Sequence, residues 1–183
     1  MLRRLILALP VMLAPAGVAA QEFVPVPGLI SDEDFYRLVA CAAPPGGGCA
    51  KPMIRWPETR RHPLRIGIAA IAPGFPGYKF DLVDRAIDTA IDQINATGAD
   101  LVLVRVYEGA LDVPFYLVET PQGGRIEGTS IAELDGADIA MARVALRSRG
   151  GDIHAAAIAI SQDIRRREII SVVLEELVQS LGL

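Results

Sequence analysis

A long amphipathic segment that follows an aliphatic stretch limits the folds open to this chain. The apolar residues of this segment recur at three- and four-residue steps, which places them on one face of a helix: Val83, Ala86, Ile87, Ala90, Ile91 and Ile94. Thr97 and Gly98 then supply a stop signal, so we predict a helix over residues 80–96. Residues 64–71 are mostly aliphatic, as in a strand buried on both faces. Helices and a sheet must therefore share one core.

Four further stretches have the composition of strands. Residues 100–109 and 113–120 are separated by a turn of hairpin length, so we expect them to pair. Residues 136–146 and 153–161 are joined by a Gly-Gly turn, although the alanines of the second stretch would also suit a helix. A second helical pattern covers residues 165–181. The order of elements predicts an α+β fold with a mixed β-sheet and two long helices.

The first 20 residues have the composition of a secretory signal peptide. Arg3 and Arg4 precede an apolar run over residues 5–16, and small residues at 18–20 predict cleavage before Gln21. The run contains two prolines and is too short to span a bilayer. We expect a periplasmic or secreted protein with no membrane insertion after signal cleavage. Beyond residues 1–20, we expect an N-terminal segment over 21–61 and an α+β domain over 62–183.

Two cysteines support export to an oxidising compartment. Cys41 and Cys49 flank the sequence AAPPGGG, which can turn back on itself, so we predict a disulfide. A metal or redox role is the alternative, but the CxxC spacing is absent. Ser31 before three acidic residues predicts the N-cap of a short helix that leads into this loop.

The charge of the chain argues against a nucleic-acid partner. The formal net charge is −4 over 183 residues, and removal of Arg3 and Arg4 leaves 16 basic and 22 acidic side chains, a charge of about −6. Binding to a phosphate backbone depends on clustered positive charge, so we expect no nucleic-acid binding. Protein partners stay open.

The last predicted helix carries the sequence EELVQSLG over residues 175–182. Glu175 and Gln179 lie one helical turn apart on the same face, and Glu176 precedes Gln179 by three residues. With histidine in place of Glu175 and Gln179, the pattern would read HExxHxxG, which is the zinc-binding helix of a metallopeptidase.

This helix resembles the active-site helix of matrixin-type metzincins, and GADIAMARV (residues 136–144) is similar to their ADI strand. From SDEDFYRLVACAAPPGGGCAKPMIRWP to VVLEELVQSLGL, the chain resembles a bacterial exported family, domain of unknown function 2927, which is grouped with zincin-like peptidases. The resemblance implies a zincin-like mixed sheet with two long helices, the last being a degenerate active-site helix. Because zincins place a second subdomain below this helix, we expect the domain over residues 62–183 to lack it.

The resemblance also implies roles for three residues. Glu175 and Gln179 occupy the metal-ligand positions and Glu176 the position of the general base, with zinc as the cofactor. A glutamine amide oxygen is a poor zinc donor beside imidazole, and the third ligand position lies beyond Leu183. Spacing does not place His62 or His154 at the helix. Without a metal, a glutamate with a reference pKa of about 4.3 has little power to deprotonate water at neutral pH.

Two classes of function follow. The first is a catalytically inactive zincin-like binding or assembly module with an unidentified protein partner. The second is a metal-dependent peptidase or hydrolase with an unconventional site around Glu175, Glu176 and Gln179.

Two further features have open interpretations. Arg105 belongs either to a buried ion pair or to an exposed strand edge. The first long helix carries an acidic stripe that is either a solvated face or a surface for a cation or a basic partner. The stripe consists of Asp81, Asp84, Asp88 and Asp92.

Overall fold

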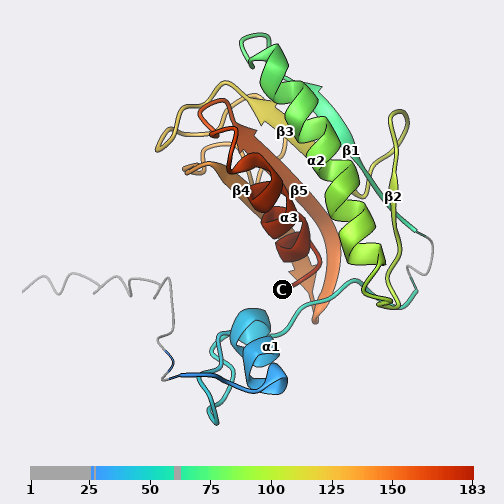
Figure 1. Cartoon of the computed structure of the whole chain (residues 1–183), viewed down its shortest axis with the longest axis vertical. Helices are drawn as coiled ribbons and strands as arrows, with labels where there is room; N and C mark the ends of the chain where they lie inside the picture. Colours follow the sequence, from blue (N-terminus) through green and yellow to red (C-terminus); the bar gives the residue numbers. More distant parts are fainter. Residues whose placement is uncertain (1–25, 27, 60–62) are drawn as a thin grey trace, which may run out of the picture.

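A computed structural model describes residues 26, 28–59 and 63–183, so the predicted signal peptide lies outside the described residues. Within this part, three helices and a five-stranded sheet form (Figure 1). The mixed α+β class is confirmed. In chain order the elements are α1 (Asp32–Cys41), β1 (Leu64–Ile71), α2 (Gly77–Asn95), β2 (Leu103–Arg105), β3 (Val113–Val118), β4 (Ala142–Arg149), β5 (Asp152–Ser161) and α3 (Ile169–Ser180).

The sheet has the strand order β2-β1-β3-β5-β4. Strands β2, β1, β3 and β5 run parallel to one another, and β4, at the edge beside β5, is antiparallel to them. The predicted hairpin of residues 100–109 and 113–120 is wrong, because β1 lies between β2 and β3. Residues on either side of the 106–112 connection bond to β1 instead: Val106 N–H donates to the Ile66 carbonyl, and Asp112 N–H donates to the Arg65 carbonyl.

The predicted elements differ from the observed ones mainly at their ends. α2 begins three residues earlier than expected, after Pro76 as N-cap, and it has 19 residues. α3 begins at Ile169 and has only 12 residues, so the arginines at 165–167 precede the helix. β4 begins at Ala142 and not near residue 136. The segment before it is irregular, and Gly136 adopts a positive φ of 84° that favours glycine.

Helices cover one face of the sheet and a loop covers part of the other. α2 and α3 lie side by side on the same face (Figure 1). Side chains alternate along β3, so Phe115 and Leu117 join the core beneath the helices while Val118 points to the opposite face. There, Val118 packs with Ile126 and other residues of the 119–141 loop. Buried apolar residues of the loop therefore attach it to this face of the sheet.

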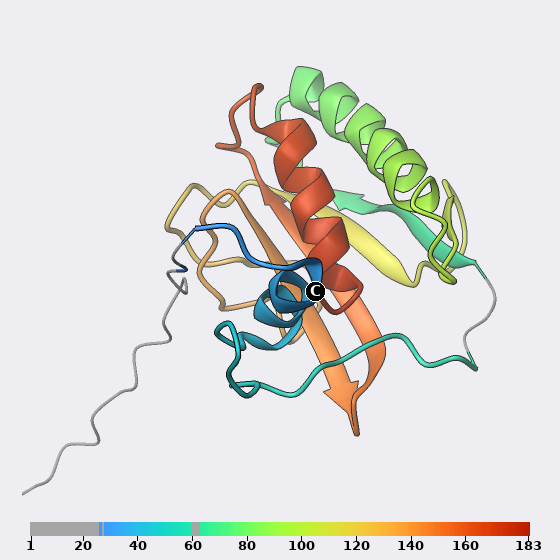
Figure 2. The same cartoon turned by 60° about the horizontal axis from the view of Figure 1, so that its bottom comes forward.

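The N-terminal segment is tied to the C-terminal end of α3. α1 lies apart from the sheet, beyond that end of α3 (Figures 1 and 2). The Ser31 side chain accepts a hydrogen bond from Asp34 N–H, which confirms the predicted N-cap. Cys41 and Cys49 form the predicted disulfide, with a Cα–Cα distance of 5.1 Å. Beyond it, the Trp56 indole N–H donates to the Ser180 carbonyl at 3.0 Å.

None of the helices within residues 28–59 and 63–183 combines the length and the apolarity needed to cross a membrane.

Candidate functional site

The EExxQ helix, α3, packs on the sheet beside α2 and lies over β4 and β5. Val173 and Leu177 are fully buried in the core, which fixes the rotation of the helix about its axis. α3 contacts α2, β4 and β5. Because successive residues on a helix are about 100° apart, Glu175 and Glu176 leave α3 in different directions. The burial of the apolar face of α3 therefore determines which neighbours the Glu175 and Glu176 carboxylates contact.

Glu175 and Gln179 contact each other at the surface. Gln179 Nε2 donates a hydrogen bond to Glu175 Oε1 over 3.2 Å, as their one-turn spacing predicts. The Glu175 residue is exposed, and Gln179 is half-buried. This contact occupies one carboxylate oxygen without requiring any ligand.

Glu176 instead turns toward the edge strand β4. The backbone N–H of Val144 donates a hydrogen bond to its carboxylate, and the Arg143 guanidinium acts on it as a nearby positive charge. Its Oε2 atom is buried and has no hydrogen-bond partner among the described residues. A half-buried carboxyl group with one unsatisfied oxygen is unusual in a folded protein.

The pKa of Glu176 is raised to about 7. Burial is the main cause, because it removes water from the charged form, and the adjacent Glu175 charge raises the pKa further. The Arg143 charge and the Val144 N–H oppose the shift. The expectation of an ordinary, weakly basic glutamate is therefore corrected: a carboxylate with a pKa near 7 can exchange protons at neutral pH. No sequence signal near Glu176 marks this, since its burial depends on β4.

The described residues do not provide a three-donor zinc site. Among residues 26, 28–59 and 63–183, no three side chains of His, Cys, Asp or Glu come together where they could hold a metal ion. His154 is exposed on β5, and His62 lies outside the described residues. Catalytic zinc takes three protein ligands, which Glu175 and Gln179 alone do not supply. Metal binding by these two residues stays a prediction.

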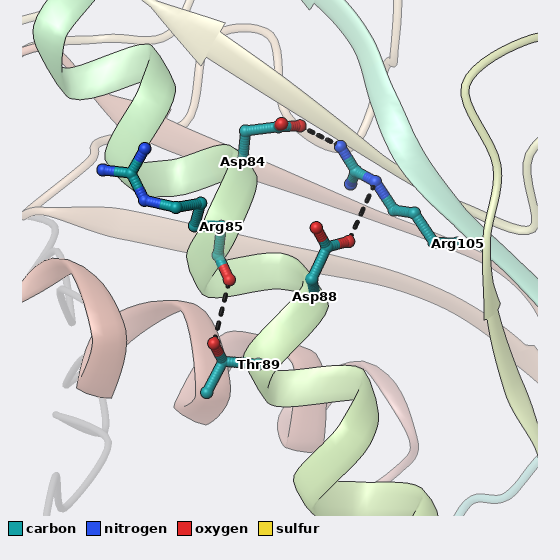
Figure 3. A network of polar contacts seen from close by, with 5 residues as sticks. All are labelled: Asp84, Arg85, Asp88, Thr89 and Arg105. Atoms are coloured by element: carbon teal, nitrogen blue, oxygen red, sulfur yellow. Dashed lines mark hydrogen bonds and ion pairs between the residues drawn. The ribbon is translucent and has the colours of Figure 1, made fainter.

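Arg105 belongs to a largely buried ion-pair cluster between β2 and α2 (Figure 3). Its guanidinium bonds to Asp84, lies 3.5 Å from Asp88 Oδ1, and stacks 4.9 Å from the centre of the Tyr107 ring. Only 11% of the Arg105 side chain is exposed. The acidic stripe of α2 is thus divided, because two of its members, Asp84 and Asp88, hold β2 in place while Asp81 and Asp92 face solvent.

Asn95 closes the same region from the end of α2. Its side-chain amide donates to the Leu103 carbonyl and accepts from the Leu103 N–H, each at 2.9 Å. These two bonds attach the start of β2 to α2. The Asn95 side chain therefore has a structural role in the sheet edge.

Comparisons with known proteins leave the family of this chain open. No protein-family model matches the sequence, and a search of curated proteins finds no match.

Proposed function

We propose that this chain is an exported zincin-like domain, related to the domain of unknown function 2927 family, that binds a protein partner without hydrolysing it. The mixed sheet, with α3 against it, supports the zincin-like part of the proposal. The proposed binding surface is defined by α3 residues 175–179 and strand β4.

One observation carries the non-hydrolytic assignment: the carboxylates of α3 have separate partners within the protein. Glu175 accepts from Gln179, whereas Glu176 accepts from the backbone of β4. The two groups therefore do not converge on a common ligand position, and the described residues add no cluster that could complete a metal site.

Strand β4 supports a partner that presents an extended segment. It is the last strand of the sheet and pairs only with β5, so its outer edge can accept another strand. Three exposed arginines lie along it: Arg143, Arg147 and Arg149. Positive charge on an edge strand discourages pairing between copies and favours a partner segment with acidic side chains.

A hydrolase is the second candidate, and the pKa of Glu176 favours it. A general base works best when its pKa lies near the working pH, and Glu176 meets that condition with a pKa of about 7. Raised carboxyl pKa values occur at active sites. They also occur where a carboxyl group is buried without a full set of hydrogen-bond partners.

Site-specific photo-crosslinking in cells tests the binding proposal. A photoreactive residue at position 143, which is exposed on β4, should give a discrete crosslinked partner, whereas the same residue at position 92, exposed on α2, should not. Replacing Arg147 and Arg149 by Glu should reduce the yield at position 143. Equal crosslinking at both positions would contradict a specific surface on β4.

A metal and cleavage assay separates the two candidates. We expect the purified protein to show no peptide cleavage that depends on Glu176. A stoichiometric bound zinc ion, together with cleavage that Glu176→Gln abolishes and Glu168→Gln retains, would establish the hydrolase. Glu168 is a matched control because it precedes the same helix and pairs with Arg165.

A further inference from the structure

A second site lies at the carboxyl ends of β1 and β3, away from the α3–β4 surface. The chain leaves β1 toward α2 on the helix-covered face and leaves β3 toward the 119–141 loop on the opposite face. Adjacent parallel strands whose connections diverge in this way leave a crevice outside their carboxyl ends, where open α/β sheets bind ligands.

The structure has a cavity of about 620 Å³ at this place. The end of β1 and the residues after it form one wall, β3 and the residues after it form the floor, and part of the 119–141 loop forms the other wall. The volume lies within the range of small-molecule sites. The topology and the cavity agree on the same position.

The walls of this cavity are held in place by hydrogen bonds. Gly74 N–H donates to Glu119 Oε1, and the absence of a Cβ at position 74 lets that carboxylate lie close to the backbone. On the other wall, Asp135 accepts from the Thr129 hydroxyl at 2.7 Å and from the N–H groups of Thr129 and Ser130. The cavity is therefore preformed and does not depend on a ligand to order it.

The charges around the cavity favour a cation. Glu119 and Glu127 line it, and the one basic residue in its lining, Arg125, lies 3.7 Å from Asp138 and is offset by it. Asp135 adds a negative charge near Tyr116, which is a lining residue. Burial and this charge together raise the pKa of Tyr116. The lining therefore carries two carboxylates and one guanidinium, a formal charge of −1.

The remaining lining suits an organic cation better than a bare metal ion. The half-buried ring of Tyr116 forms part of the floor, with Ile71 and Val118 beside it. Aromatic faces attract ammonium and guanidinium groups, and aliphatic walls accommodate the carbon chain of such a ligand. No group of His, Cys, Asp or Glu within the described residues is arranged to hold a metal ion.

We propose that this cavity, the β1–β3 crevice, binds a small organic cation, with an ammonium or guanidinium group between Glu119 and Glu127 and against the Tyr116 ring. The proposal is independent of partner binding at the α3–β4 surface.

Nuclear magnetic resonance titration of the ¹⁵N-labelled protein tests it. The probes are choline, which carries a quaternary ammonium group, and agmatine, which carries a guanidinium group and a primary amine. The control is 3,3-dimethylbutan-1-ol, the uncharged isostere of choline. We expect saturable shifts at residues 70–72, 119–120 and 127–129 with one cation or both, and none with the isostere. Added salt should weaken binding, because the contacts are electrostatic.

Substitutions define the site. Glu119→Gln keeps an oxygen for Gly74 N–H but removes the charge, and it should weaken binding about fivefold, as should Glu127→Gln. Asp92→Asn removes a charge near the other end of α2 and should leave affinity unchanged. Tyr116→Phe should retain binding and Tyr116→Leu should reduce it. The proposal is overturned if neither cation gives saturable shifts, if the isostere binds equally, or if both Gln variants bind like the unmodified protein.

Discussion

At the scale of single residues, Glu176 shows how a neighbour from another element changes a side chain's chemistry. On an isolated helix its carboxyl group would face water beside Glu175. In the fold it is half-buried against β4, where Val144 N–H and the Arg143 charge only partly replace the lost water. The shifted pKa makes protein stability depend on pH.

Glu176→Gln should stabilise the protein at pH values above 7. The pKa of Glu176 is about 7 in the folded protein and 4.5 for an ordinary glutamate, so the folded state holds a proton that the unfolded state releases between these values. The contribution of Glu176 to stability is therefore fully present below pH 4.5 and is lost as the pH rises through 7. Glutamine stays neutral, so the variant should gain about 3 kcal/mol relative to the unmodified protein near pH 8 and little near pH 4.5.

Urea unfolding of both proteins at the two pH values measures this difference. A gain that is the same at both pH values would show that the carboxyl group is not shifted. Asp81→Asn, at an exposed position on α2, serves as the control for the general loss of one negative charge.

Arg105 gives a second prediction at this scale. Arg105→Met keeps most of the side-chain volume but leaves Asp84 and Asp88 facing each other without the guanidinium. We expect a loss of about 2 kcal/mol in unfolding free energy, since the ion pairs of the buried guanidinium and its contact with Tyr107 are lost, and the two neighbouring carboxylates then repel each other. Arg147→Met, which breaks the exposed pair with Glu133, should cost less than about 1 kcal/mol. Equal losses in denaturant unfolding would contradict the structural role of Arg105.

At the scale of elements, α1 depends on local restraints. Ser31 caps its start, and the disulfide closes a loop at its end over a sequence separation of 8 residues. The buried residues of α1, Ala40 and Cys41, lie outside both hydrophobic clusters of the sheet. The stability of α1 should therefore be separable from that of the sheet.

Reduction of the disulfide should unfold α1 while the sheet stays folded. A loop of this length gives a disulfide about 2.5 kcal/mol of chain-entropy stabilisation, which is large for a helix of 10 residues. Hydrogen exchange should show faster exchange of α1 amides with reductant and unchanged exchange of β5 amides. Loss of protection in β5 would mean that α1 is part of the main cooperative unit.

At the scale of the whole molecule, the segment after α1 joins distant parts of the chain. Arg55 N–H donates to the Gly151 carbonyl, and Ile153 N–H donates to the Arg55 carbonyl, so the segment extends the sheet beside the start of β5. A Cβ at Gly182 would collide with the Ile54 carbonyl, which shows how closely the end of α3 approaches the same segment.

Trp56→Phe should weaken this junction. The change keeps an aromatic ring in the core but leaves the Ser180 carbonyl without the indole N–H donor. We expect a loss of about 1–2 kcal/mol, partly from the unsatisfied carbonyl. The junction is also expected to open earlier than the sheet, which hydrogen exchange at Ile153 N–H would detect. Thermal unfolding identical to that of the unmodified protein would contradict this role.

Local signals in the sequence determined the elements of this protein. The periodicity of α2, the Ser31 cap, the close cysteine pair and the strand at residues 64–71 are each properties of short stretches, and the structure confirms them. The expectation that this strand is buried on both faces is wrong, because its last three residues, 69–71, are exposed. The contact of Glu175 with Gln179 follows in the same way from helical spacing.

Tertiary structure alone decided which strands are neighbours and what the candidate residues contact. A turn of hairpin length does not reveal that β1 lies between β2 and β3, since strand pairing depends on residues far apart in sequence. The orientation of Glu176 toward β4, its pKa near 7, and the crevice between β1 and β3 arise only when those elements meet. Burial and charge are properties of the assembled surroundings, so the sequence could identify the EExxQ helix but not the environment of its carboxylates.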